Sequence, residues 1–214
     1  MLRSIGNMKD YFAGDPRTDR QRMLAGDWYR AFDSDNALIA QRGMELTDEY
    51  YGAEVYGEKE RAKEILHELL GEVGEDVYIK PPFYVDYGEN IYIGARTFIN
   101  FNLVALDCTE IRIGEDCMIG PNVQLLTPIH PLEKEARRAK IEKAAPITLG
   151  NNVWLGGGVI VLPGVTIGDN TVVGAGAVVT KDLPANVLAV GNPARILRSL
   201  EAEEFPPHAR AEKK

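Results

Sequence analysis

Small and aliphatic residues recur every six positions through the second half of the chain, and a second aliphatic series follows two residues behind the first. The first series is Ile147, Val153, Val159, Val165, Thr171, Ala177 and Leu183, and the second is Leu149, Leu155, Val161, Ile167, Val173 and Val179. Residues two apart in a strand point to the same side, so each unit predicts a very short strand with two inward side chains. Gly, Asn and Asp between the units tolerate the positive φ that sharp corners require.

The same repeat extends upstream. Its members are Val77, Phe83, Ile91, Thr97, Leu103, Ile111, Cys117, Val123 and Ile129. Two steps are eight residues long, which indicates bulges at corners, and the step from Ile129 to Ile147 is eighteen, three times six. No unit can bury its apolar pair alone, so coils must stack, and three units make a triangular coil. We therefore predict a mainly β fold, a parallel β-helix of roughly five coils.

Two other folds fit the pattern less well. An amphipathic helix would repeat its apolar positions every 3.6 residues, which this spacing does not. A β-sandwich of short strands would carry turn signals every 8–12 residues rather than every six.

The chain divides into three regions. Residues 1–72 are predicted to be a helical domain, residues 73–196 the β-helix with an insertion at 130–146, and residues 197–214 a C-terminal tail that is loosely held after about Leu200. The expected helices span Arg17–Ala25 after an Asp15-Pro16 start, Asp33 or Ser34 to Tyr51, and Glu58–Leu70, whose Ile65, Leu66, Leu69 and Leu70 share one face.

The composition of the chain argues against some classes of function. The formal net charge of −8 over 214 residues argues against a nucleic-acid binder, which should have a basic surface. The chain has no run of 18 apolar residues, so no membrane-spanning helix is expected. The N-terminal residues lack the apolar stretch of a signal peptide, so we expect a cytoplasmic protein. Cys108 and Cys117 fit no metal or disulfide spacing and are expected to be plain buried thiols.

His130 is the only one of three histidines that falls on the predicted β-helix, and it opens the long insertion. It could be a turn residue before Pro131, or a general base, since a neutral imidazole can take a proton from an attacking hydroxyl. Its second nitrogen would need an orienting partner, and both Glu142 and a backbone carbonyl are candidates. The insertion is densely charged, with Glu133, Lys134, Glu135, Arg137, Arg138, Lys140, Glu142 and Lys143.

A basic cluster lies near the end of the β-helix. Lys181 follows Thr180 at a late corner, and Arg195 and Arg198 come shortly after. These cations could hold the phosphates of a nucleotide-like cofactor. Ordinary solvated surface is the other interpretation, because Lys and Arg are mostly exposed.

An ordered set of motifs covers nearly the whole chain. It comprises MLAGDWY at 23–29, Asp86-Tyr87-Gly88, Asn100-Phe101-Asn102, Leu106-Asp107, His130-Pro131 with Arg137, NNVWLGG, PGVTIGDN, GAGAVVTKDLP and GNPAR. The set resembles the maltose and galactoside O-acetyltransferases of the hexapeptide-repeat acyltransferase superfamily. The resemblance implies a left-handed β-helix, although generic crossovers are right-handed. It also implies a homotrimer with active sites between subunits, and an N-terminal helical segment that covers one sheet edge.

The resemblance also implies roles for individual residues. His130 matches the catalytic base, and Gly157 offers a backbone N–H to the thioester oxygen. The matched acceptor-binding positions are Asp86, Asn100, Asp107 and Trp154, and the matched CoA-binding positions are Gly157, Ala175, Thr180, Lys181, Arg195 and Arg198. The expected reaction is direct acetyl transfer from acetyl-CoA to a hydroxyl of a sugar-like acceptor, without a metal and without a covalent acetyl-enzyme.

Three alternatives stay open at this stage. The same chemistry could serve another acceptor, such as a xenobiotic, serine or a polysaccharide sugar. A γ-type carbonic anhydrase would need three histidine ligands for zinc, and only His130 is available on the β-helix. A non-catalytic β-helix scaffold is the third.

Overall fold

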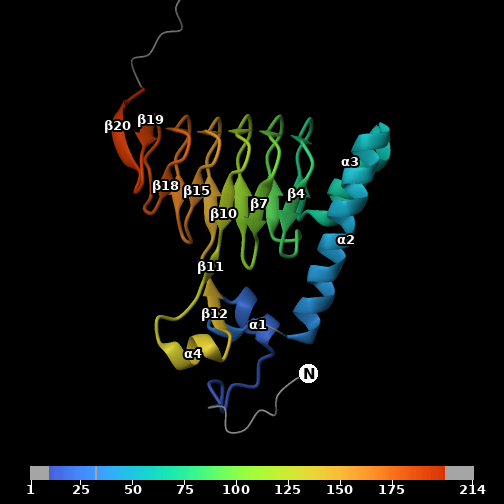
Figure 1. The fold of residues 1–214 in the computed structure, drawn as a ribbon, viewed down its shortest axis with the longest axis vertical. Helices are drawn as coiled ribbons and strands as arrows, with labels where there is room; N and C mark the ends of the chain where they lie inside the picture. The colour runs from blue at the N-terminus through green and yellow to red at the C-terminus, as the bar shows by residue number, and fades with distance from the viewer. Residues whose placement is uncertain (1–9, 32, 201–214) are drawn as a thin grey trace, which may run out of the picture.

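The computed structural model describes residues 10–31 and 33–200, and most of them form a three-sided prism of short strands (Figure 1). Each side of the prism is one sheet, and its neighbouring strands come from successive coils of the chain. The strands within a coil stack are parallel, which confirms the predicted parallel β-helix. Within the described ranges, no helix is long and apolar enough to cross a membrane.

The three sheets are called the first, second and third sheet below. The first sheet stacks β2 Glu72–Val73, β5 Ile91–Ile93, β8 Ile111–Ile113, β13 Ile147–Leu149 and β16 Thr166–Ile167. The second stacks β3 Tyr78–Ile79, β6 Phe98–Ile99, β9 Met118–Ile119, β14 Trp154–Leu155, β17 Val172–Val173, β19 Val187–Val190 and the antiparallel β20 Arg195–Ser199. The third stacks β4 Phe83–Val85, β7 Leu103–Leu106, β10 Gln124–Leu126, β15 Ile160–Val161 and β18 Val178–Val179.

Both aliphatic series point into the prism, where every member from residue 147 to residue 183 is buried. The hydroxyls of the threonines in these series donate hydrogen bonds to backbone carbonyls of a neighbouring coil. Thr97 Oγ1 donates to the Gly114 carbonyl at 2.8 Å, and Thr171 Oγ1 donates to the Pro184 carbonyl at 2.7 Å. The polar atoms inside the prism therefore keep hydrogen-bond partners, as buried polar groups require.

One predicted core residue, Ile129, lies outside the prism. The chain leaves the prism after Thr127, a buried residue whose hydroxyl donates to the Leu106 carbonyl at 2.6 Å. Ile129 belongs to β11 Pro128–Ile129, which pairs antiparallel with β12 Ile141–Ala144. Its assignment to a coil position is wrong, because an apolar residue of this outer ribbon falls by chance on the six-residue step.

Asparagines build one corner of the prism, as the sequence predicts. Asn152, Asn170 and Asn186 all adopt positive φ, between 53° and 59°. The Asn152 side chain donates to Asn170 at 3.0 Å, and the Asn170 side chain donates to Asn186 at 3.0 Å. The side chains that permit the turn thus also tie successive coils together.

Two helices cover the end of the prism where its first coil lies, α2 Ser34–Tyr56 and α3 Lys59–Leu69 (Figure 1). Leu46, Ile65 and Leu69 join the same apolar core as the coils. The hydroxyl of buried Tyr50 donates to the Ile79 carbonyl of β3 at 2.6 Å. This contact gives a partner to a backbone group at the outer edge of the stack.

The first helix starts later than the Asp15-Pro16 pair predicts. α1 spans Asp19–Leu24, and its N-cap is Thr18, which forms a capping box with Gln21. Asp15 instead accepts hydrogen bonds from Arg17 and Arg22. The correction follows from the stronger local signal, because a Thr with Gln three residues later satisfies two backbone donors at once.

The other two helices lie close to where they are expected. α2 begins after the N-cap Asp33 but continues five residues beyond the predicted end at Tyr51, to Tyr56, and Gly57 closes it at φ 76°. α3 begins and ends one residue inside the predicted span, and its predicted apolar face is buried. The predicted start of the C-terminal tail at residue 197 is wrong, because β20 continues to Ser199 and pairs with β19. The rest of the predicted tail, after Leu200, lies outside the described residues.

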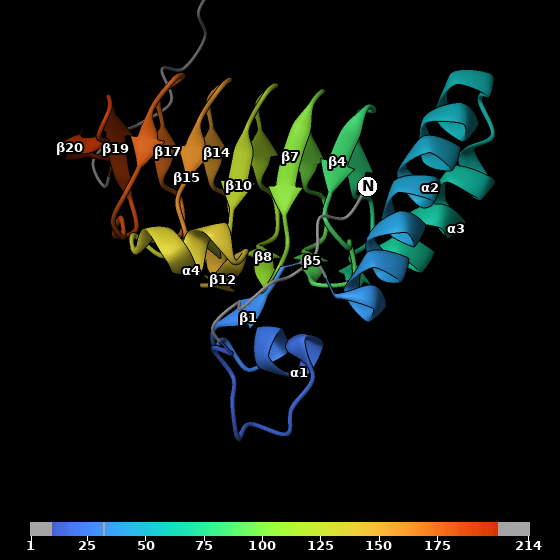
Figure 2. The ribbon, with the colours of Figure 1, turned by 60° about the horizontal axis from the view of Figure 1, so that its bottom comes forward.

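The insertion forms a ribbon beside the prism rather than a loose loop. The ribbon begins with β11, two residues before the predicted start of the insertion at 130, and continues through α4 Lys134–Arg138 and β12. The N-terminal strand β1 Tyr29–Arg30 adds to it antiparallel to β12. Figure 2 shows β1 and α1 on the side of the prism that carries α4 and β12. The N-terminal segment therefore packs on the insertion as well as leading into the helices at the end of the prism.

Candidate active site

His130 lies at the end of β11, where the insertion leaves its first strand, and its side chain is 54% exposed. Its Nδ1 lies 3.5 Å from the carbonyl oxygen of Ile141, and its Nε2 lies 3.6 Å from Oε2 of Glu142. Both candidates that the sequence left open therefore flank the imidazole, one at each nitrogen. They are successive residues of β12, so one strand supplies both.

Glu142 is a largely buried carboxylate, with a side chain only 10% exposed. Its Oε1 accepts a hydrogen bond from the hydroxyl of Tyr29, and its Oε2 faces His130. Burial raises the pKa of Glu142, while the Tyr29 hydroxyl and the charge of a protonated His130 act to lower it. The carboxylate thus has a partner at each oxygen, as a buried charge requires.

A cavity of about 520 Å³ opens beside His130 and Glu142. Asp86 lies in its wall, as the sequence predicts for an acceptor-binding position, and Lys140 lies there too. Burial raises the pKa of Asp86. The cavity is therefore lined by side chains that can both donate and accept hydrogen bonds, which suits a ligand with hydroxyl groups.

The structure does not bring Asp107 to this surface. Asp107 is fully buried, and its Oδ1 accepts hydrogen bonds from the backbone N–H groups of Asp86 at 3.0 Å and Tyr87 at 2.9 Å. Burial raises its pKa to about 6. In this chain Asp107 holds the turn that carries Asp86, so direct contact between its carboxylate and an acceptor, expected from the sequence, does not fit its position.

Cys108 lines the cavity, although the sequence marks it only as a buried thiol. It is buried as predicted, and its Sγ lies 3.4 Å from Oδ2 of Asp86 and 3.9 Å from Oε1 of Glu142. Burial raises the pKa of the Cys108 thiol, so it stays protonated. It is a wall residue that sequence reasoning missed, and its position directly after Asp107 was the available signal.

A second cavity of about 490 Å³ lies along the outer side of the second sheet. It brings together Asn100, Trp154, Gly157 and Ala175, four of the residues predicted to bind acceptor or CoA. Trp154 is 54% exposed on this side, and its neighbour Met118 is also exposed. An open, mostly apolar groove of this kind fits an extended ligand with an aliphatic arm.

Ala175 and Gly157 each present a backbone N–H to the groove that has no acceptor among the described residues, and the oxyanion is expected at that of Gly157. The Gly157 carbonyl accepts from the Gly176 N–H at 2.9 Å, whereas the Gly157 N–H is left available. A side chain on Gly120 would place its Cβ 2.6 Å from the Gly157 nitrogen. Glycine at this neighbouring corner therefore leaves room around the donor that the sequence assigns to the oxyanion.

The predicted phosphate-binding cations lie at the far end of the prism from the helices. Thr180 and Lys181 are exposed after β18, and Arg195 and Arg198 are exposed on β20. Arg198 stands opposite Leu188, which lines the groove, and side chains opposite each other across a strand pair share a face. Arg198 thus continues the side of the sheet that carries Trp154.

A single chain keeps the two halves of the predicted site apart. The cavity beside His130 and the groove beside Trp154 share no lining residue. They also lie on different parts of the molecule, one against the insertion and the other on the second sheet.

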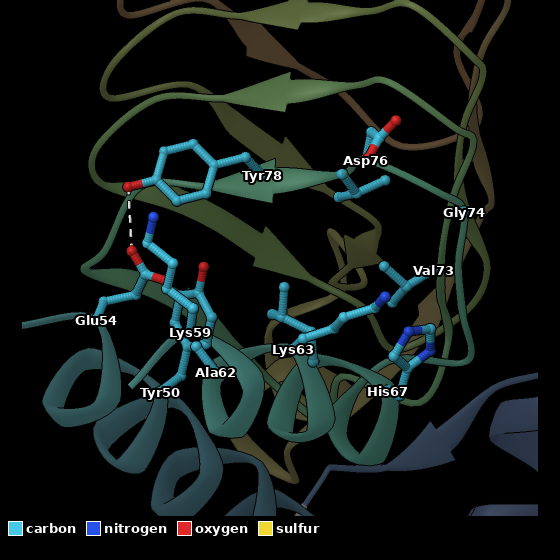
Figure 3. A pocket seen from close by; sticks show the side chains of 12 residues that line it. Tyr50, Glu54, Lys59, Ala62, Lys63, His67, Val73, Gly74, Asp76 and Tyr78 are labelled. Atoms are coloured by element: carbon cyan, nitrogen blue, oxygen red, sulfur yellow. Dashed lines mark hydrogen bonds between the residues drawn. The ribbon is translucent and has the colours of Figure 1, made fainter. Parts of the chain in front are cut away.

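A further cavity of about 400 Å³ lies between α3 and the first coil, and none of the predicted site residues lines it. Figure 3 shows Lys59, Lys63 and His67 along α3, facing β3 and the corner before it. Tyr78 donates from its hydroxyl to Glu54 at 3.1 Å across one end. This surface provides matched control residues for tests of the site described above.

Comparisons with known proteins bear on the family and the fold of the chain. Residues 22–74 match the maltose acetyltransferase hexapeptide capping motif, and residues 146–181 match the bacterial transferase hexapeptide model of six repeats. Nodulation protein L of Rhizobium meliloti (strain 1021) is 46% identical over 84% of this chain and 98% of its own length. Galactoside O-acetyltransferase of Escherichia coli (strain K12) is 46% identical over 67% of this chain and 70% of its own length.

Two solved structures share the fold over most of their length. A maltose O-acetyltransferase from Clostridium difficile 630 is 41% identical, with a TM-score of 0.84 over 86% of this chain and 98% of that one. A galactoside acetyltransferase in complex with coenzyme A is 39% identical, with a TM-score of 0.80 over 86% of this chain and 92% of that one. The chain therefore belongs to the maltose and galactoside O-acetyltransferase family of hexapeptide-repeat acyltransferases.

Proposed function

We propose that this protein transfers the acetyl group of acetyl-CoA to a hydroxyl of a sugar-like acceptor, with His130 as the general base. The observation that carries the proposal is the exposed imidazole of His130, flanked at Nδ1 by the Ile141 carbonyl and near Nε2 by Glu142. The coenzyme A bound to a related galactoside acetyltransferase supports acetyl-CoA as the donor.

The proposed mechanism uses the tautomer of His130 with its proton on Nδ1. A proton on Nδ1 can be donated to the Ile141 carbonyl, which leaves the lone pair of Nε2 free. Nε2 then removes the proton of the acceptor hydroxyl as its oxygen attacks the thioester carbon. Glu142 stabilises the positive charge that appears on the ring.

The acetyl carbonyl gains negative charge as the new C–O bond forms, and we assign the stabilisation of that oxyanion to the Gly157 N–H. The C–S bond then breaks, and the CoA sulfur leaves with the proton that His130 has taken. Cys108 is not the nucleophile in this scheme, since burial raises the pKa of its thiol. The transfer is direct and forms no acetyl-enzyme.

A homotrimer would bring the two halves of the site together, with His130 of one subunit beside the groove of the next. The outer positions of the second sheet are mostly apolar, as Tyr78, Phe98, Met118, Trp154, Val172 and Leu188. Those of the third sheet are Tyr84, Val104, Gln124, Ile160 and Val178, also mostly apolar, whereas the first sheet presents Glu72, Tyr92, Arg112, Thr148 and Thr166. Two different apolar sides favour a heterologous contact that closes into a ring.

The polar cavity beside His130 supports a hydroxyl-rich acceptor such as a maltose-, galactoside- or glucose-like sugar. Asp86, Asn100 and Trp154 are the residues that we assign to its binding. The dense charge of the insertion keeps other hydroxyl acceptors as the alternative, among them serine, a xenobiotic or a polysaccharide sugar. A non-catalytic scaffold is disfavoured by the polar partners at both nitrogens of His130.

The direct test follows the thiol released from acetyl-CoA in the presence of glucose, maltose, a galactoside, serine and chloramphenicol. We expect release above the hydrolysis rate with at least one sugar, and a mass close to three times the 23.6 kDa chain in sedimentation equilibrium. Release with serine or chloramphenicol alone would contradict the sugar acceptor. Release with none of the five would contradict the proposed activity, and a stable monomer would contradict the shared site.

We expect Lys181→Ala and Arg198→Ala each to raise KM for acetyl-CoA about tenfold, because each removes one charge-assisted contact to a phosphate. kcat should stay close to that of the wild type, since neither side chain reaches the acetyl group. Steady-state kinetics with varied acetyl-CoA measure both constants. Lys59→Ala, a lysine of the cavity under α3, is the matched control and should change neither.

A further inference from the structure

The N-terminal strand β1 lies against the strand that supplies both partners of His130. β1 pairs antiparallel with β12 so that Tyr29 stands opposite Glu142 and Arg30 stands opposite Ile141. The Ala31 N–H also donates to the Lys140 carbonyl at 2.9 Å. The position of the Glu142 side chain and that of the Ile141 carbonyl therefore depend on a segment more than a hundred residues earlier in the chain.

Tyr29 provides the side-chain link in this arrangement. It is fully buried, packed in a small apolar cluster with Met23, Tyr87, Cys108 and Ala144. Its hydroxyl donates to Oε1 of Glu142. Burial raises the pKa of the phenol strongly, so the group is a neutral donor throughout the working pH range.

We propose that Tyr29 is a positioning residue of the active site, whose hydroxyl holds the Glu142 carboxylate by one oxygen and thereby presents the other oxygen to His130. The proposal rests on the proposed function of His130 as general base. It makes the N-terminal segment part of the catalytic apparatus and gives it a role beyond covering the end of the prism.

Three other groups near Glu142 bear on its protonation. Asp86 lies close enough for its negative charge to oppose ionisation of Glu142. Cys108 has its Sγ 3.9 Å from Oε1 but is a protonated thiol, and burial holds the pKa of the Tyr87 phenol above its usual range. The groups that favour the ionised carboxylate are therefore Tyr29 and the His130 ring that it faces.

The sign of the expected effect follows from these contacts. Glu142 stabilises a protonated His130 only when it is ionised, that is, above its own pKa. The hydrogen bond from Tyr29 lowers that pKa, so its loss must raise it. Less of the carboxylate is then ionised at any pH near the midpoint, and the loss is recovered as the pH rises.

Tyr29→Phe tests the proposal, because it deletes one oxygen and leaves the ring in the apolar cluster. We expect the Glu142 carboxyl ¹³C titration in the full-length protein to move up by about one pH unit, as expected for a hydrogen bond to a charged group. Glu142→Gln identifies the resonance. The acid limb of the kcat–pH profile should move in the same direction, with kcat about tenfold lower on that limb and KM for acetyl-CoA unchanged.

Tyr50→Phe is the matched control, since it also removes a buried tyrosine hydroxyl, but one that donates to the Ile79 carbonyl. Both variants should lose similar stability, and only Tyr29→Phe should shift the titration and the acid limb. In a Glu142→Gln background, Tyr29→Phe should cause no further loss of kcat.

An unmoved Glu142 titration in Tyr29→Phe would overturn the proposal, as would an additive loss of kcat in the double variant. The carboxyl titration does not depend on turnover. If the wild-type protein transferred acetyl to none of the acceptors, the proposed function would fail, and the titration would still decide whether Tyr29 holds Glu142.

Discussion

His130→Ala is expected to lower kcat by roughly 10²–10⁴-fold, the range typical of removing a general base. In the proposed mechanism the imidazole takes the hydroxyl proton, whereas Ile141 offers only a backbone carbonyl and Glu142 is largely buried, with one oxygen held by Tyr29. The affinity for acetyl-CoA, measured by calorimetry, should be retained, since the predicted CoA residues line a separate groove. The melting temperature should change little, because the side chain is more than half exposed.

His67→Ala is the matched control for this variant. His67 is an exposed histidine of α3 in the cavity shown in Figure 3, and its loss should leave kcat and KM at wild-type values. Added imidazole should restore part of the turnover of His130→Ala and none in the wild type. Unchanged turnover in His130→Ala would refute the assignment of the base.

Gly156→Ala is expected to lower the free energy of unfolding by about 3 kcal/mol or more. The added Cβ would lie 2.5 Å from the Ala175 nitrogen and 2.9 Å from the Ala175 Cα. Both are backbone atoms of the next coil, so no side chain can rotate away and the stack itself must shift. Because Gly157 is the next residue, we also expect weaker acetyl transfer in the fraction that folds.

Gly52→Ala makes the same chemical change but is expected to have the opposite effect on stability. Gly52 lies inside α2, and a Cβ there would meet no atom within 4 Å. Replacing an interior helical glycine by alanine should raise the free energy of unfolding by about 0.5–1 kcal/mol. Urea unfolding at one fixed protein concentration measures the free energy of unfolding of both variants. Equal changes in the two variants would contradict the prediction that close packing between coils requires glycine at position 156.

The prism could be predicted residue by residue because its signal is periodic. Each pair such as Val153 and Leu155 repeats the same local geometry, so the sequence alone assigns its inward faces. Ile129 was misplaced because the point where the chain leaves a coil has no periodic mark. The residue that ends the coil is Thr127, whose burial depends on a hydrogen bond to Leu106 in the coil before it.

The site was predicted less completely, since its contacts join distant segments. His130 and Glu142 could be proposed from the sequence, but Asp107 was given an acceptor-binding role that its burial does not fit. Its hydrogen bonds run to backbone groups 17 to 21 residues earlier, which no local pattern reveals. Tyr29 was missed for the same reason, as its partner Glu142 is 113 residues away.

The coil stack of the second sheet also has a consequence for donor choice. Trp154 pairs with Val172, Val172 with Leu188 and Leu188 with Arg198, so three strand spacings of about 4.8 Å each separate Trp154 from Arg198. The distance between these two residues can change only in steps of one strand spacing, because only whole turns of the solenoid can be inserted or deleted. In the proposed site the stacked coils set the distance between Trp154 and Arg198, so a variant one turn longer should favour a donor whose arm is about 4.8 Å longer.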